Sequence, residues 1–383
     1  MRLPTIKFNR NEFAGSFGDI GTDLPLIAGI LLASGIDAAS ALIMFGLMQV
    51  FTALKYGMPM SVQPLKVFAT IVIAQKLTGP VIFAGGLAIG IIMLLLTITG
   101  LIEKLATLIP KPVIRGIQFG LGIQLAMLAV KNYILPAGST ETYIIAAITF
   151  ITGLVLLGNR KYPPAIFIIL TGIVYAVFEG KINNAKIVSG FGFHLPEINT
   201  HFKMPDIITG IILLALPQIP LSLGNSIFAT KQIANDFFPE KKITATKISY
   251  TYSLMNIINP FFSGIPTCHG SGGMAGHYTF GARTAGSIVI YGCFFLVSGL
   301  FFAGGFHSII NFFPLPVLGV ILFFESLTLI TFLKDISEIK SELFIAVTVG
   351  LTCAFLPFGY GIGMPLGLFL YYCKIPHSAY FNK

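Results

Sequence analysis

Apolar stretches of roughly helical length follow one another along almost the whole chain. If about 20 residues form one membrane span and shorter half-helices are allowed, the pattern predicts about fourteen segments. They cover 14–34, 39–56, 62–76, 80–101, 113–130, 142–158 and 163–179, and, after a polar linker over 180–205, 206–230, 246–263, 269–281, 284–306, 315–333, 342–357 and 361–373. They lack the strict alternation of a membrane β-barrel. We therefore expect an all-α membrane protein.

Two of these segments, 62–76 and 269–281, are short and follow polar breaks. The breaks begin with Gly57–Pro59 and Gly264–Pro266, both of the form Gly-x-Pro. Such residues leave backbone groups unpaired, and at membrane depth this is tolerated only where the backbone lines a cavity or is buried in protein. We expect half-helices whose amino ends present free N–H groups and a positive dipole end to an anion.

The breaks belong to a wider set of echoes between the two halves of the chain. Gly-x-Pro returns after 207 residues, Pro110–Val113 returns as Pro314–Val317 after 204, and Gly18 with Asp19 corresponds to Gly224 with Asn225 after 206. Three echoes in one order predict duplicated halves, 1–180 and 205–383. Seven segments per half is an odd number, so tandem halves must have opposite orientations, which is the inverted-repeat architecture. Paired interruptions of this kind mark the binding sites of transporters.

The candidate substrate ligands are polar or small residues at these breaks and at the interruptions of the first and eighth segments. They are Thr22, Ser61, Gln63, Pro64, Lys66, Asn225, Ser226, Thr267, Cys268, His269, Gly270 and Ser271. Small residues let an anion approach the backbone amides closely. One alternative is hydrogen bonding between neighbouring helices. Another is nucleophilic catalysis by Cys268 and His269, although no orienting carboxylate is evident beside them.

Ionisable residues in or beside the apolar segments are functional candidates, because a charge is costly at membrane depth. Asp19, Asp23, His269 and Glu325 are the groups that could carry a coupled proton. Two helix amino ends supply roughly +1 together, so a dianion needs a further cation or a proton. Lys66 could neutralise the substrate or pair with Asp19 or Asp23.

Composition agrees with a membrane protein. Hydrophobic residues make up 55% of the 383 residues and charged residues 10%, whereas soluble domains carry about 25% charged residues. The net charge of +9 does not indicate nucleic acid, because most lysines and arginines fall on or near one side of the membrane if the N-terminus is cytoplasmic. This bias predicts both termini in the cytoplasm. The four cysteines lie in or beside apolar segments without metal-binding spacing, so we expect no disulfide framework, metal or cofactor.

Four stretches together resemble one known family. They are Gly15–Thr22, Gly57–Lys66, Pro220–Ile227 with Asp236–Pro239, and Pro266–Arg283, which contains the specific run Pro-x-x-His-Gly-x-Gly-Gly-x-Ala-Gly. The chain resembles the molybdate transporter family, a branch of the SulP-like (sulfate permease) superfamily. The resemblance implies a seven-plus-seven inverted repeat with half-helices in spans 3 and 10. It also implies a core domain of spans 1–4 and 8–11 that carries the oxyanion against a gate domain of spans 5–7 and 12–14, within a homodimer.

Two features depart from that family. Most sulfate permeases end in a soluble regulatory domain, and no such domain is expected here after Lys383. Asp23 stands where many members are expected to have an apolar or aromatic residue, which affects the charge of the site or its coupling.

The functional hypotheses come from three classes. The first is secondary-active uptake of a tetrahedral oxyanion, molybdate foremost, by alternating access, with sulfate and tungstate left open because such dianions are of similar size. The second is a proton-coupled nucleobase-type symporter, which would need aromatic stacking and a carboxylate in the site. The third is a membrane enzyme using Cys268 and His269. A transporter should retain uptake after Cys268→Ala, whereas a cysteine enzyme should lose all activity.

Overall fold

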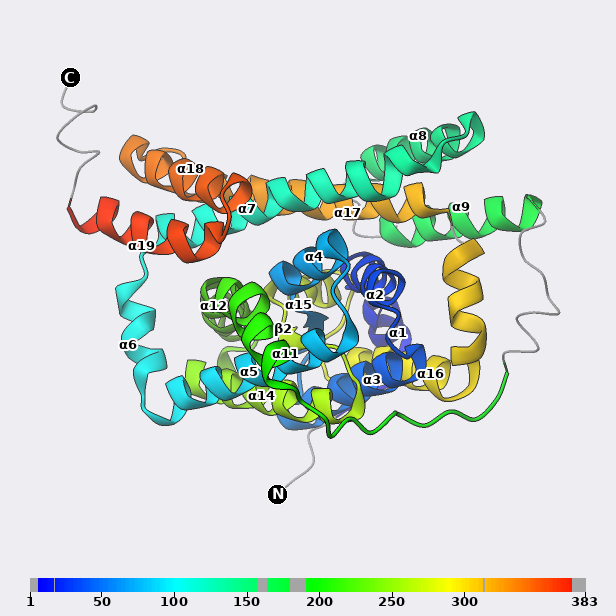
Figure 1. Ribbon diagram of the computed structural model, residues 1–383, viewed down its shortest axis with the longest axis horizontal. Coiled ribbons are helices and arrows are strands. Elements are labelled where there is room, and N and C mark those ends of the chain that lie inside the picture. Colours follow the sequence, from blue (N-terminus) through cyan, green and yellow to red (C-terminus); the bar gives the residue numbers. More distant parts are fainter. Residues whose placement is uncertain (1–5, 17, 157–163, 180–190, 313, 374–383) are drawn as a thin grey trace.

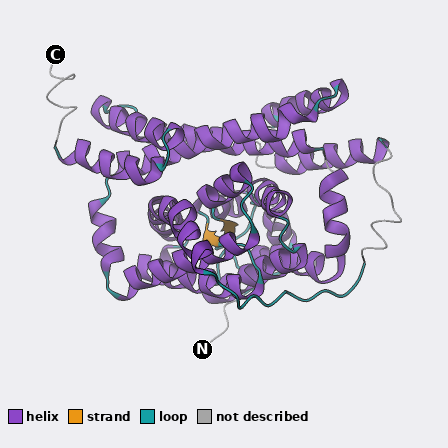
Figure 2. Cartoon of the chain, in the orientation of Figure 1, coloured by secondary structure: helices purple, strands orange, loops and turns teal. Residues whose placement is uncertain are grey.

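The computed structural model describes residues 6–16, 18–156, 164–179, 191–312 and 314–373. Helices dominate this part of the chain, with two short strands at the centre (Figure 2). In the first half lie α1 (Arg10–Ser16), α2 (Ile20–Ser34), α3 (Ala38–Tyr56), β1 (Val62–Pro64), α4 (Lys66–Gln75), α5 (Gly79–Ile98), α6 (Leu101–Leu108), α7 (Lys111–Leu128), the π-helical turn η1 (Ala129–Ile134), α8 (Thr140–Val155) and α9 (Pro164–Phe178).

The described part of the second half contains thirteen further elements that position the site. They are α11 (Met204–Thr209), η3 (Gly210–Ala215), α12 (Leu216–Leu221), η4 (Ser222–Ala229), α13 (Thr230–Phe237), α14 (Ala245–Ile258), β2 (Thr267–His269), α15 (Ser271–Thr279), α16 (Gly286–Phe312), α17 (Leu315–Thr331), η7 (Phe332–Ile336), α18 (Lys340–Phe355) and α19 (Gly359–Tyr372). Each predicted apolar segment therefore coincides with helical structure.

The helices form two groups (Figure 1). Helices α7, α8, α9, α17, α18 and α19 lie in a layer along the top of the view, and α1–α5 with α11–α15 surround the strands beneath it. Helices α6 and α16 run between the groups on opposite sides. In the upper layer α7 packs against α17 and α18, and in the lower group α3 packs against α16 and α5 against α14.

Small residues allow the closest of these helix contacts. A Cβ atom on Gly116 of α7 would lie 2.7 Å from the Ala346 carbonyl oxygen of α18, and one on Gly46 of α3 would lie 2.6 Å from the Gly292 carbonyl oxygen of α16. Neither site has room for a side chain. Backbones that approach this closely gain van der Waals contact. In a bilayer this contact helps to hold helices together, because the hydrophobic effect does not drive them to associate there.

Seven helical stretches among the described residues are long and apolar enough to cross a bilayer. They are Arg10–Ser34, Ala38–Tyr56, Gly79–Ile98, Lys111–Ile134, Met204–Phe237, Gly286–Gly305 and Leu315–Ile336. The other predicted segments coincide with shorter helices. The fold is thus that of a helical membrane protein, and the arrangement of about fourteen spans stays a prediction.

The first and eighth segments are interrupted in different ways. In the first, α1 ends at Ser16 and α2 begins at Ile20, with Asp19 immediately before it. The eighth stays helical over Met204–Phe237, although its two prolines predicted a break. Its π-helical turns η3 and η4 flank Pro217 and Pro220. A wider turn can accommodate a residue that cannot donate the regular helical hydrogen bond, so the chain continues without unwinding.

Candidate functional site

The two Gly-x-Pro breaks meet at the centre of the lower group. Strands β1 and β2 pair antiparallel, with Val62 opposite His269, Gln63 opposite Cys268 and Pro64 opposite Thr267. All six strand residues are buried. The two interrupted stretches therefore lie side by side, although they are some 200 residues apart in sequence.

Side-chain amides form hydrogen bonds with the backbone groups on the outer edge of each strand. The Gln49 amide donates to the Val62 carbonyl at 2.7 Å and its oxygen accepts from the Val62 N–H at 3.1 Å. The Asn256 amide likewise donates to the Thr267 carbonyl at 2.6 Å and accepts from its N–H at 2.9 Å. Open strand edges are costly away from water, so these amides allow extended chain at this depth. Neither amide was predicted from the sequence, although Gln49 and Asn256 stand 207 residues apart in apolar segments.

A short helix starts directly after each strand. Helix α4 begins at Lys66 and α15 at Ser271, and neither start has a side-chain cap. The N–H groups of a first helical turn have no intrahelical acceptor. In α4 one of them, that of Phe68, donates to Gln218 Oε1 at 3.1 Å. The remaining first-turn amides and the two dipole ends create positive potential around the strand pair.

Three glycines at the start of α15 differ in what surrounds them. A Cβ on Gly270 would lie 2.2 Å from Gln63 Oε1, and one on Gly273 would lie 1.9 Å from Asp19 Oδ2. At Gly272 a Cβ would meet nothing within 4 Å. The first two glycines thus allow side chains from the other half to reach this backbone, while the third leaves the helix start open to a ligand.

Asp19 and Gln63 form the centre of the first-half site. Gln63 Nε2 donates to Asp19 Oδ1 at 2.6 Å, and both side chains are buried. Asp19 Oδ2 and Gln63 Oε1 have no hydrogen-bond partner among the described residues. Both are acceptors, so a bound proton or an incoming donor would satisfy them.

Asp23 lies deeper, on the first turn of α2, and is fully buried. It accepts a 3.0 Å hydrogen bond from the Tyr291 hydroxyl of α16, while its other oxygen lacks a partner within the described structure. Thr22 precedes it and is also buried. Tyr291 was not among the residues predicted from the sequence.

Lys66 forms an ion pair with Glu325 of α17. The sequence suggested Asp19 or Asp23 as its partner if it paired within the protein. The structure shows a different partner because α4 starts beside the upper layer, where α17 passes. The lysine is buried and the glutamate only partly exposed, so the pair joins the two groups of helices at the site.

The second half contributes a parallel set of polar groups. Asn225 Oδ1 accepts from Ser271 Oγ at 3.0 Å and from Gln118 Nε2 of α7 at 3.2 Å. Ser226 Oγ is buried without a partner in the described structure. Gln118 was not identified from the sequence, where it is one of two glutamines in segment 113–130. Through Gln118 the upper layer contacts the site a second time.

Some predicted ligands face away from the helix starts. His269 shares a 2.7 Å hydrogen bond with Thr251 of α14 through Nε2. The Thr267 hydroxyl accepts from Asn259 at 3.3 Å. Side chains alternate sides along a strand. Cys268 therefore lies on the same face as its partner Gln63. Its neighbours Thr267 and His269 lie on the opposite face, toward α14. Of the described candidates, Ser61, Gln63, Lys66, Asn225, Gly270 and Ser271 come together around the helix starts. Ser61 does so by donating to the Gly270 carbonyl at 3.1 Å.

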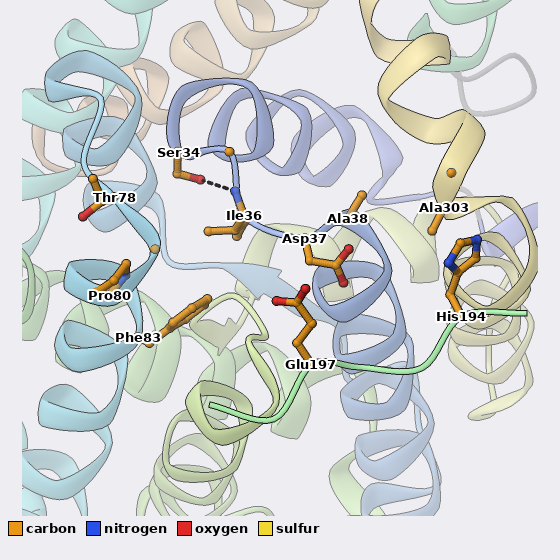
Figure 3. Close-up of a pocket in the computed structure, with 13 residues that line it drawn as sticks. Ser34, Ile36, Asp37, Ala38, Thr78, Pro80, Phe83, His194, Glu197 and Ala303 are labelled. Atoms are coloured by element: carbon orange, nitrogen blue, oxygen red, sulfur yellow. Dashed lines mark hydrogen bonds between the residues drawn. The ribbon is translucent and has the colours of Figure 1, made fainter. Parts of the chain in front are cut away.

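A separate cavity, with a volume of about 660 Å³, lies elsewhere. It is bounded by the α2–α3 and α4–α5 turns, α16 and the extended chain around His194. Figure 3 shows the Asp37 and Glu197 carboxylates facing this space. Asp37 also caps α3 by accepting from the Ser40 N–H at 2.6 Å. Two carboxylates without a lysine or arginine in the lining do not suit an anion, so the strand pair remains the candidate site.

Comparison with known proteins identifies the relatives of this chain. The family model described as "Molybdate transporter of MFS superfamily" matches residues 11–125 and 210–329. Molybdate transporter 2 of Arabidopsis thaliana is 31% identical over 94% of this chain and 87% of its own length. Molybdate transporter 1 of the same plant is also 31% identical, over 87% and 82%. These relatives are named as transporters, in agreement with the expectation that the chain is not an enzyme.

The fold has solved counterparts. The transmembrane domain of a cyanobacterium bicarbonate transporter aligns with a TM-score of 0.66 at 18% identity, covering 93% of this chain and all of that domain. At this identity the likeness shows the fold alone. The family match and the two plant relatives, however, confirm the resemblance carried by the four sequence stretches. The chain belongs to the molybdate transporter family.

Proposed function

We propose that the protein moves a tetrahedral oxyanion, molybdate foremost, across a membrane. The observation that carries this is the β1–β2 pair, which places the amino ends of α4 and α15 beside each other with Lys66 at the start of α4. Helix amino ends and a lysine are the groups that hold oxyanions in proteins. The names of the plant relatives support molybdate as the substrate.

The charges around the strand pair favour coupling to protons. Three carboxylates, those of Asp19, Asp23 and Glu325, lie around the strand pair. Lys66 pairs with one of them, Glu325. A dianion entering against an inside-negative potential costs about 4.6 kcal/mol per 100 mV. Protons bound with it would offset that cost. A proton on Asp19 would also turn a carboxylate that repels the substrate into a hydrogen-bond donor.

We propose that the upper layer of helices is the gate and the lower group the core, related by an inverted repeat. The amides of Gln49 and Asn256, 207 residues apart, each bond the outer backbone edge of one strand, which supports the repeat. The ion pair of Lys66 with Glu325 and the contact of Gln118 with Asn225 join the layers. Alternating access would break and remake such contacts. Assembly as a homodimer and cytoplasmic termini are part of the same proposal.

Competition binding to the purified protein tests the proposal. Molybdate should bind, and tungstate, sulfate and phosphate should compete in an order that defines the selectivity. Gln63→Ala removes an amide from the site and should weaken binding about 10- to 100-fold, the cost of one hydrogen bond to a charged group. Binding of no oxyanion at all would overturn the proposal.

Two control variants show whether a loss is specific. Gln232→Ala removes an exposed glutamine that bonds Asp236 at 2.8 Å on α13, and it should leave affinity unchanged. Cys268→Ala should retain uptake, because the contact of the buried thiol with the Pro64 carbonyl, at 4.0 Å, is long and weak. Complete loss of activity in Cys268→Ala, with folding intact, would instead favour chemistry at this cysteine.

A further inference from the structure

The first turns of α7 contact the lower group of helices, and two cavities lie between the groups toward the other end of this helix. Near its start, Gln118 of α7 bonds Asn225, as described above. Toward its end, a cavity of about 270 Å³ lies between α4 and α7, and a second of about 240 Å³ extends from it along α12 and the α18–α19 turn. Ile71, Gln75 and Gln124 line both cavities.

The lining of this paired space is suited to an anion. Among the described residues that line the two cavities, Lys131 is the one with an ionised side chain. The amides of Gln75 and Asn132 line the first cavity as well. Gln124 is fixed in place, because it donates to the Cys353 carbonyl at 3.0 Å and accepts from the Tyr360 hydroxyl at 2.6 Å. The acidic cavity of Figure 3 has the opposite character.

The backbone around Lys131 departs from regular helix. Residues Ala129–Ile134 form the π-helical turn η1, which includes Lys131 and Asn132. Such turns are rare and occur frequently at functional sites, because the extra residue redirects side chains. Lys131 forms no ion pair with any described residue. Its ammonium group is therefore available to a ligand.

Helix α4 contributes residues both to the cavity and to the candidate site. Thr70 lines the cavity and donates to the Lys66 carbonyl at 2.8 Å, one helical turn from the start of α4. Four residues of helix span roughly 6 Å. Gln75, which lines the cavity, is nine residues beyond Lys66. An oxyanion held at Gln75 is therefore about 14 Å along α4 from the lysine that is paired with Glu325.

We propose that this space is a receiving site for the oxyanion, where Lys131, Asn132 and Gln75 hold the ion before it moves along α4 to Lys66. The inference rests on the proposed function, since it concerns the same substrate. A single cation at a rim raises the rate of encounter more than the final affinity. The receiving site therefore sets how efficiently dilute substrate is captured.

Initial-rate uptake of radiolabelled molybdate by cells tests the receiving site. Lys131→Gln should raise KM roughly threefold to tenfold while the maximal rate changes little, and Lys131→Arg should restore KM. The control is Lys203→Gln, which removes an exposed lysine before α11 that lines neither cavity. An unchanged KM in Lys131→Gln, or an equal change in Lys203→Gln, would overturn the receiving site.

A second pair of variants decides the matter if Lys131→Gln fails to fold. Gln75→Lys adds a cation to the cavity and should lower KM, whereas Gln75→Glu should raise it. Equal KM values for the two would also overturn the receiving site. If the wild-type protein takes up no oxyanion, the proposed function itself fails. If wild-type uptake is normal and all these variants match it, only the receiving site fails.

Discussion

Lys66 and Glu325 hold opposite charges at the point where the two groups of helices meet. The carboxylate of Glu325 is paired with Lys66, the cation that a bound dianion would need. A ligand that binds at the helix starts therefore competes with Glu325 for Lys66. The pair gives a reason why substrate binding would loosen the contact between the layers, because a displaced carboxylate no longer joins α17 to α4.

This competition predicts an unusual response of Glu325→Gln. Removing the carboxylate leaves Lys66 buried without a partner, which should destabilise the empty protein by up to about 3–5 kcal/mol, less whatever water at the partly exposed side recovers. A bound dianion would replace the lost charge. The rise in melting temperature on adding molybdate should therefore be larger in Glu325→Gln than in the wild type, as thermal unfolding would show.

Glu240→Gln is the matched control, because Glu240 is exposed in a connection outside the predicted spans. It should respond to molybdate as the wild type does. A smaller ligand-induced rise in Glu325→Gln than in wild type would mean that the ion pair is not part of the binding site.

At the scale of elements, the sequence predicted the two Gly-x-Pro breaks but not which way each side chain points. Proline and glycine mark the two breaks directly, since both act locally on the backbone. Strand register is a tertiary property. It directs His269 toward Thr251 and leaves Gln63 on the side of Asp19.

The partners from distant helices could not be predicted for the same reason. Gln118, Tyr291 and the pairing of Lys66 with Glu325 depend on how the two groups of helices pack. The eighth segment shows another limit of local rules. Its prolines predicted an opening of the chain, and π-helical turns kept it helical instead.

The start of α15 gives a prediction that separates fold from binding. Gly272→Ala places a Cβ in open space in front of the helix, so the protein should keep its melting temperature while molybdate affinity falls. Gly270→Ala and Gly273→Ala would bring a Cβ against Gln63 and Asp19, so both should lower the melting temperature. Thermal unfolding and equilibrium binding measure the two effects independently.

The glycine series has a clear contrary outcome. If Gly272→Ala binds molybdate as tightly as the wild type, the open side of this helix start does not face the ligand. In that case the amide groups of α15 would have to be reassigned to a purely structural role.

At the scale of the whole molecule, charge balance governs direction and driving force. The site combines three carboxylates with one lysine, so we predict that an inward proton gradient accelerates molybdate uptake into proteoliposomes. Protons that travel with the dianion reduce the electrical cost of import, about 4.6 kcal/mol per 100 mV for two uncompensated charges. Uptake that ignores an imposed pH gradient would argue against proton coupling.

The position of bound molybdate tests the candidate site most directly. X-ray diffraction from crystals soaked in molybdate and recorded near the molybdenum absorption edge would locate the metal directly. We predict one strong anomalous peak beside the strand pair, within hydrogen-bonding reach of Gln63 and of the first-turn amides of α15. A peak confined to the cavity of Asp37 and Glu197, or no peak at saturating molybdate, would contradict it.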